Sequence, residues 1–129
     1  VGKSGLLVES DLAFADVNPK EFDAILIPGG WSPDYLRRLP DVLNIVKTMH
    51  EDNKVIGQIC HAGWVLASAN ILKGVNVTST PGIKDDLTNA GAIWHNVEAI
   101  RDGNIISARR PPDLPYYLPL IIDALTEDK

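Results

Sequence analysis

The sequence predicts one α/β domain with a mostly parallel sheet, helices on both faces and a small β-hairpin. Strand-like apolar runs alternate with segments of helical periodicity, which is typical of this class. Residues 22–27 and 55–59 have the apolar character of strands buried on both faces of a parallel sheet. Asp102-Gly103 lies between two apolar runs, which is a strong hairpin signal. The chain has 129 residues, so we expect residues 1–129 to form a single domain.

The first half of the chain predicts two strands and two helices. Residues 4–12 predict an extended stretch, and residues 18–21 a turn or the start of a short helix. The strand over residues 22–27 ends at Pro28-Gly29-Gly30. A helix is expected to begin at Ser32-Pro33-Asp34, because serine caps helices and proline suits the first turn. Pro40 starts a second helix that reaches about residue 50.

The second half continues the alternation after the strand at residues 55–59. We expect a helix over residues 62–72, a strand over 75–78 and a short helix over 84–90. Residues 97–101 and 104–107 form the predicted hairpin. The last helix is expected over residues 114–125, capped by Asp113.

Composition excludes several functions. The net charge is −5 and the densest basic spots are only pairs, so no nucleic-acid partner is expected. One cysteine allows no internal disulfide and fits a reducing compartment. With few histidines beside it, no metal and no other cofactor is expected. No apolar run has transmembrane length and no signal peptide opens the chain, so we expect a cytoplasmic protein without a membrane partner.

Cys60 is the strongest candidate for chemistry. It stands where the strand over residues 55–59 runs directly into a helix, at the carboxyl edge where open α/β sheets place their ligands. The adjacent helix start stabilises a thiolate, and small residues such as Gly57 and Gly63 permit the tight turn of a nucleophile elbow. The alternative is a buried structural cysteine. Because neighbouring side chains at an elbow usually point apart, His61 is expected to offer only its backbone N–H.

The turn Pro28-Gly29-Gly30 is the second candidate. Glycines at the end of a neighbouring strand let backbone N–H groups face a ligand, as an oxyanion hole requires. A plain turn is the alternative. Trp31 follows and either lines a substrate cleft or covers the core, while Trp94 is expected in the core. His50 and His95 are expected at helix ends or on the surface.

Four runs carry a resemblance to a known family: EFDAILIPGG (21–30), QICHA (58–62), TSTPGIKDDLTNAG (78–91) and SARRPPDLP (107–115). The chain resembles the ThiJ/PfpI superfamily, and within it the PfpI-type intracellular proteases. The resemblance implies a flavodoxin-like sheet related to class I glutamine amidotransferases. It also implies Cys60 as nucleophile with His61, and an anion pocket formed by the N–H groups of Gly29, Gly30 and His61.

The resemblance further implies an acidic residue, here Asp34, that completes the site across a subunit interface. Relatives open with a strand–helix–strand unit and a glutamate near the cysteine, and neither matches this chain. We therefore expect a domain incomplete at its N-terminus, with exposed apolar edges at residues 25–27 and 55–59. A homo-oligomer, or a second chain that fills the gap, is expected.

Several functions fit one nucleophilic sulfur. The leading hypothesis is a cysteine-dependent hydrolase of peptide or amide carbonyls. A glyoxalase- or deglycase-type enzyme acting on reactive aldehydes is the alternative, although it would use the glutamate missing here. A redox sensor and an inactive paralogue are the two non-enzymatic hypotheses.

Overall fold

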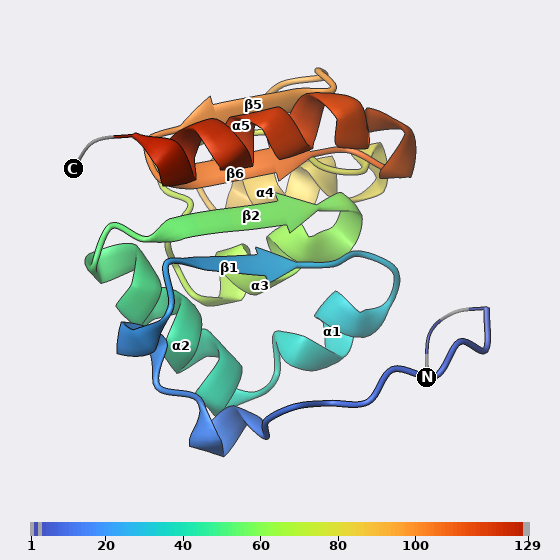
Figure 1. Cartoon of the computed structure of the whole chain (residues 1–129). Helices are drawn as coiled ribbons and strands as arrows, with labels where there is room; N and C mark the ends of the chain where they lie inside the picture. The colour runs from blue at the N-terminus through green and yellow to red at the C-terminus, as the bar shows by residue number, and fades with distance from the viewer. Residues whose placement is uncertain (1, 3, 128–129) are drawn as a thin grey trace.

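The computed structural model describes residue 2 and residues 4–127. Its main sheet has the strand order β1 (Ala24–Ile27), β2 (Val55–Ile59), β6 (Ile105–Ala108) and β5 (Ala99–Asp102). The first three are mutually parallel, and β5 pairs with β6 as the antiparallel arm of the hairpin (Figure 1). The predicted flavodoxin-like class, with a mostly parallel sheet and a small hairpin, is confirmed.

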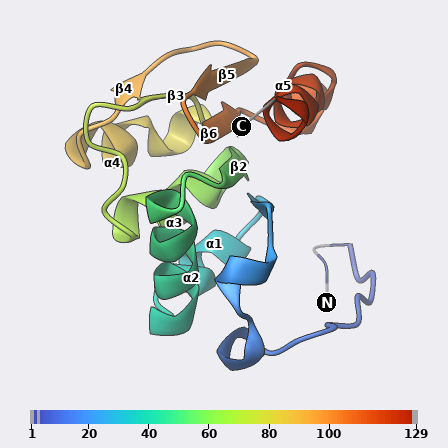
Figure 2. The ribbon, with the colours of Figure 1, turned by 60° about the vertical axis from the view of Figure 1, so that its left-hand side comes forward.

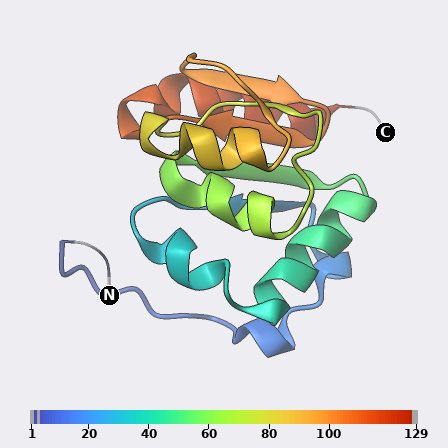
Figure 3. The ribbon, with the colours of Figure 1, turned by 180° about the vertical axis from the view of Figure 1, so that it is seen from behind.

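Helices cover both faces of this sheet. Helices α1 (Ser32–Leu36), α2 (Pro40–Glu51), α3 (Gly63–Ser68) and α4 (Lys84–Asn89) gather on one side, and α5 (Leu114–Thr126) lies on the other (Figures 2 and 3). Successive side chains of β2 point to opposite faces of the sheet, so this strand contributes to the core on each face. Ile56 packs with the α2 and α3 side, whereas Val55 packs with Tyr117 and Ile121 of α5. No helix among the described residues has the length and apolar character needed to cross a bilayer.

The strand predicted over residues 75–78 does not join the main sheet. It shortens to β3 (Asn76–Val77), which pairs in parallel with β4 (Ile93–Trp94), a strand that the sequence did not reveal. The main sheet ends at β1 and β5, and neither of these edge strands pairs with β3. The helix predicted over residues 62–72 ends at Ser68, because Asn70 adopts a left-handed backbone (φ 64°) that cannot continue it.

β1 forms one edge of the main sheet, and β5 forms the other. Leu26 is 52% exposed, so the prediction that β1 is buried on both faces is wrong. Helix α5 covers β5 and β6 but leaves that face of β1 open (Figure 1). The expected edge at residues 55–59 is also wrong, since β2 pairs on both sides and is buried over residues 55–58. Residues 4–12, predicted as an extended stretch, form no strand: they have a turn at residue 4 and bends at residues 5 and 11–12, are exposed, and lead away from the sheet (Figure 3).

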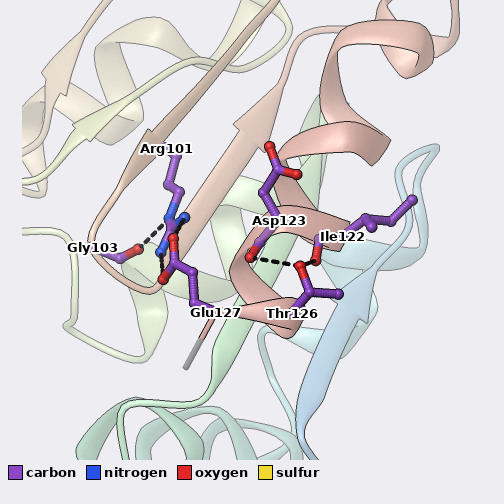
Figure 4. A network of polar contacts seen from close by, with 6 residues as sticks. All are labelled: Arg101, Gly103, Ile122, Asp123, Thr126 and Glu127. Atoms are coloured by element: carbon purple, nitrogen blue, oxygen red, sulfur yellow. Dashed lines mark hydrogen bonds and ion pairs between the residues drawn. The ribbon is translucent and has the colours of Figure 1, made fainter. Parts of the chain in front are cut away.

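Ion pairs hold the ends of α5. At its carboxyl end, Arg101 of β5 donates two hydrogen bonds to Glu127, at 2.5 and 2.8 Å, and a third to the carbonyl of Gly103 (Figure 4). The hydrogen bonds from Arg101 hold the pKa of Glu127 below its usual value. At the amino end, Asp113 occupies the cap position without capping, because its carboxylate accepts hydrogen bonds from Arg109 instead. The predicted capping role of Asp113 is therefore wrong.

Candidate active site

Cys60 lies on a strained turn at the carboxyl end of β2. Its φ is 62°, in the left-handed region that non-glycine residues rarely adopt, and a 3₁₀ turn over Cys60–Ala62 leads directly into α3. The Cys60 carbonyl accepts a hydrogen bond from the N–H of Thr80 at 3.2 Å, which fixes the turn from the neighbouring loop. The cysteine is half-buried and unpaired by a disulfide. These features are those of a nucleophile elbow rather than of a cysteine sealed in the core.

The side chains of Cys60 and His61 meet. Sγ of Cys60 lies 3.2 Å from Nδ1 of His61. The expectation that the two side chains point apart is wrong, because the left-handed backbone at Cys60 breaks the alternation that an extended strand would impose. The histidine ring is therefore in direct contact with the candidate nucleophile, and can exchange a proton with it.

Gly29 packs directly against the cysteine. A Cβ at position 29 would lie 2.6 Å from Cβ and 3.3 Å from Sγ of Cys60. The parallel register of β1 and β2, with Ile27 opposite Gln58, creates this proximity. Gly30 needs its glycine for a different reason, a φ of 71°. Within the described residues, the N–H groups of Gly29 and Gly30 donate to no backbone carbonyl, so they remain available to a ligand.

Three aromatic rings cluster at His61, the residue that touches the cysteine. The ring centroid of His61 lies 5.3 Å from that of Trp31 and 5.0 Å from that of Trp64, and the two indoles stack at 5.3 Å with an interplanar angle of 15°. Trp31 is 72% exposed. This exposure argues against Trp31 as a cover of the core, and its role in lining a substrate cleft stays a prediction. The stack joins Trp31 to Trp64, 33 positions later; both residues flank the pocket that the sequence predicts, but their mutual contact was not predicted.

Asp34 lies near this group in sequence but not in contact with the histidine. Its carboxylate is exposed and lies 3.6 Å from Nη2 of Arg38, one helical turn later. In the part of the chain that the structure describes, no carboxylate hydrogen-bonds His61. A role for Asp34 at the histidine of its own chain is thus not supported by the geometry, and its action across a subunit interface stays a prediction.

A buried network of hydrogen bonds, which the sequence analysis did not predict, links β2 to its neighbours just before the turn at Cys60. Gln58, two residues before the nucleophile, donates from Nε2 to the Thr78 carbonyl at 3.0 Å. The N–H of Thr78 in turn donates to Oγ of Ser107 on β6 at 3.0 Å. All three residues are fully buried, and the bonds tie β2, β6 and the end of β3 together. A polar residue inside an otherwise apolar strand, as Gln58 is, was the available signal.

His50, His95 and Trp94 make hydrogen bonds away from Cys60. His50, in the last turn of α2, contacts Asn104, and His95 follows β4 and contacts Asn76. Trp94 packs against the larger core cluster while its Nε1 donates to Ser79. Among residues 2 and 4–127, no three His, Cys, Asp or Glu side chains gather as metal ligands would.

The fold and the elbow together define a class of protein: flavodoxin-like α/β domains that present a cysteine where a central parallel strand turns into a helix. Within that class, the chain belongs to the DJ-1/PfpI family, whose family model matches residues 1–124. The resemblance drawn from the four sequence runs is confirmed.

Curated relatives share much of this sequence. A deglycase of Pyrococcus abyssi is 47% identical over 117 residues, which cover 91% of this chain and 70% of the relative. Deglycase PfpI of Pyrococcus furiosus is 44% identical over the same shares. YraA of Bacillus subtilis, which carries the provisional name of a cysteine protease, is 42% identical over 90% of this chain and 69% of its own length.

Solved structures share the fold. A two-domain protein of Anabaena variabilis, with DJ-1/ThiJ/PfpI-like and ferritin-like domains, superimposes with a TM-score of 0.93 and 35% identity. The match covers 96% of this chain and 36% of that larger protein. A ThiJ/PfpI domain protein of Brachyspira murdochii superimposes with a TM-score of 0.92 at 24% identity, over 99% of this chain and 74% of the other.

Proposed function

We propose that this chain is a deglycase- or glyoxalase-type enzyme that acts on reactive aldehydes through a covalent adduct at Cys60. The 3.2 Å contact between Sγ of Cys60 and Nδ1 of His61 is the observation that carries the proposal. An imidazole at this distance accepts the thiol proton and leaves a thiolate, the nucleophilic form of cysteine. The names of the archaeal deglycases among the relatives support the aldehyde alternative over the leading sequence-based hypothesis of a peptide hydrolase.

The reaction proceeds without an oxidant. The thiolate attacks the aldehyde carbon of an α-oxoaldehyde, and protonated His61 returns its proton to the new alkoxide, which gives a hemithioacetal. His61 then removes the proton of that carbon to give an enediolate, the hydroxyl proton passes to the neighbouring oxygen, and His61 returns its proton to the neighbouring carbon, which yields the thioester of a 2-hydroxy acid. Water cleaves the thioester and restores the thiol. One water molecule is added overall, with no net oxidation.

Backbone N–H groups stabilise the charge that develops on oxygen. Those of Gly29 and Gly30 have no backbone acceptor within the described residues, and Gly29 packs against the cysteine. Donors held in a turn need no reorganisation when the alkoxide forms. Because this chemistry needs a reduced Cys60, it fits a cytoplasmic location.

Peptide or amide hydrolysis is the second candidate, supported by the name of YraA. It would use the same nucleophile and N–H groups, but a hydrolase also needs a group that orients the histidine. Asp34 of the same chain is paired with Arg38. Hydrolysis therefore depends on Asp34 of a second copy, as the sequence-based hypothesis holds.

A homo-oligomer forms part of the proposal. The free edge of β1 presents unpaired backbone groups, and Leu26 is exposed beside Ile121 of α5. Leu118, Ile122 and Leu125 continue this apolar surface along α5. Edges of this kind are normally covered by another strand. Sedimentation analysis is expected to give a species larger than one chain, and a monodisperse monomer would contradict the expectation.

A paired assay tests the function. The protein and its Cys60→Ala variant are each given methylglyoxal and a peptide amide, and iodoacetamide labelling of the thiol is timed. We expect the wild type to consume methylglyoxal and to be labelled rapidly at neutral pH, and the folded variant to do neither.

Each other outcome selects an alternative. Peptide cleavage without aldehyde consumption would establish the hydrolase. Turnover that survives Cys60→Ala would remove the cysteine from the mechanism. A thiol that peroxide converts to sulfenic acid, in a protein with neither activity, would indicate the redox sensor.

A further inference from the structure

The exposed indole of Trp31 has no structural role that explains its position. It is 72% exposed and directly follows the glycine turn. Its recorded ring contacts are the stack on Trp64 and the tilted contact with His61, the residue that touches the nucleophile. A large apolar ring held open to solvent beside a reactive sulfur is suited to contact a ligand.

The support beneath this ring is fixed. Nε1 of Trp64 donates to Oδ2 of Asp86 on α4 at 2.8 Å, which anchors the polar edge of the indole. The guanidinium of Arg37 lies over the same ring, 5.5 Å from its centroid, and its Nε donates to Oγ of Ser68 at 2.9 Å. Trp64 lies on α3 and is contacted by Arg37, directly after α1, and by Asp86 on α4, so the surface that Trp31 stacks on is preorganised.

We propose that Trp31 and Trp64 form a stacking platform that selects aldehydes carrying a planar, uncharged substituent, such as an aryl group, next to the reacting carbonyl. The proposal rests on the proposed function and names the substrate class of the same site. His61 contacts both indoles and the sulfur of Cys60, so a planar group that lies against the exposed indole would be close to the residue that touches the nucleophile.

The charges around the platform exclude a cationic substituent. Arg37 already places a guanidinium over Trp64. His61 becomes positively charged when it takes the thiol proton, so a second positive charge beside it would be repelled. Asp86 is engaged with Trp64, and the carboxylate of Asp34 is paired with Arg38. A neutral planar group gains the stacking energy without this repulsion.

Binding is tested separately from chemistry in the Cys60→Ala variant. Its tryptophan fluorescence is titrated with benzamide, which is planar and neutral, with benzamidine, which is planar and cationic, and with cyclohexanecarboxamide, which is neutral but not planar. We expect benzamide to bind about three- to tenfold more tightly than cyclohexanecarboxamide, the range of a single aromatic contact. Benzamide should also bind more tightly than benzamidine, because the guanidinium of Arg37 over Trp64, which repels a cation, is still present in this variant.

Substitutions at position 31 then locate the effect. The benzamide preference is expected to disappear in Trp31→Ala and to persist in part in Trp31→Phe, which keeps a flat ring. Trp94→Phe is the control, because Trp94 packs in the core and donates to Ser79. Equal binding of benzamide and cyclohexanecarboxamide, tighter binding of benzamidine, or a preference unaffected by Trp31→Ala would each overturn the proposal.

Turnover by the wild-type protein links the platform to the reaction. The ratio of kcat/KM for phenylglyoxal to that for methylglyoxal is expected to fall about three- to tenfold in Trp31→Ala, and an unchanged ratio would refute the assignment. If neither aldehyde is consumed but benzamide still binds selectively through Trp31, the proposed function fails while the platform stands. If both aldehydes are consumed and Trp31→Ala changes neither rate, the proposed stacking platform is refuted while the proposed function stands.

Discussion

Replacing Gly29 by alanine should displace the nucleophile without unfolding the protein. The new Cβ would lie 2.6 Å from Cβ of Cys60, 3.3 Å from its Sγ and 3.3 Å from the carbonyl oxygen of Ile59. Carbon atoms in contact normally lie at about 3.5–4.0 Å, so the two segments must separate by about 1 Å. Cβ of Cys60 is fixed by the backbone at that residue, and the third neighbour is a backbone oxygen of Ile59, so rotation of a side chain cannot relieve the strain at the closest contact.

The magnitude follows from this displacement. Overpacking of this kind costs about 1–3 kcal/mol of the free energy of unfolding, which urea denaturation measures. A shift of about 1 Å at a reacting group lowers the rate about 100-fold. We therefore expect Gly29→Ala to lower kcat/KM for methylglyoxal by about that factor, and to change the rate at which iodoacetamide labels Cys60.

Gly82→Ala is the matched control. A Cβ there would meet no heavy atom within 4 Å, and Gly82 does not have a positive φ. Its stability, labelling rate and turnover should equal those of the wild type. A folded Gly29→Ala variant with wild-type labelling and turnover would refute the close packing of Gly29 on Cys60. Because labelling needs no substrate, the result does not depend on which reaction the protein catalyses.

Two further predictions concern α5. Gly57→Ala should lower the free energy of unfolding by about 1–3 kcal/mol, because the new Cβ would meet the Tyr117 hydroxyl and lie 2.7 Å from Cδ2 of Leu26. Iodoacetamide should still label Cys60 at the wild-type rate. Unchanged stability in urea would contradict this packing. Hydrogen bonds from Arg109 hold the pKa of Asp113 below its ordinary value, so this carboxylate stabilises the fold above about pH 4, its unfolded pKa, and the contribution is lost as pH falls through the lower folded pKa. The free energy of unfolding of Asp113→Asn should therefore depend less steeply on pH below about pH 4 than that of the wild type. Substitution of the exposed Asp23 by Asn is the control. Parallel curves for Asp113→Asn and the wild type would show that the Arg109–Asp113 pair does not stabilise the fold.

Local patterns were enough to predict the parts of the fold that depend on neighbours in sequence. The strand before Cys60, the hairpin at Asp102-Gly103 and the helix from Leu114 all form where periodicity and turn residues indicated. β4 escaped notice because a strand of two residues has no measurable period. Leu26 was misjudged because its exposure depends on how far α5 reaches across the sheet, which is set by tertiary packing.

The site was predicted in its residues but not in its geometry. The motif runs indicated Cys60, His61 and the glycine turn. The contact between Sγ of Cys60 and Nδ1 of His61 depends on the positive φ at Cys60. A positive φ is uncommon for any residue other than glycine, so the presence of a cysteine at this position did not indicate it. The stack of Trp31 on Trp64 and the bond from Trp64 to Asp86 join distant positions, and no spacing rule predicts such pairs.

The left-handed turn at Cys60 affects how this protein would respond to directed evolution. Glycine adopts a φ of 62° without the penalty of roughly 1–2 kcal/mol that a Cβ brings. A variant library screened only for heat resistance would therefore enrich glycine at position 60 and lose the sulfur. Engineers who want a more robust catalyst should screen for thiol reactivity alongside melting temperature, and should seek stabilising changes elsewhere in the chain.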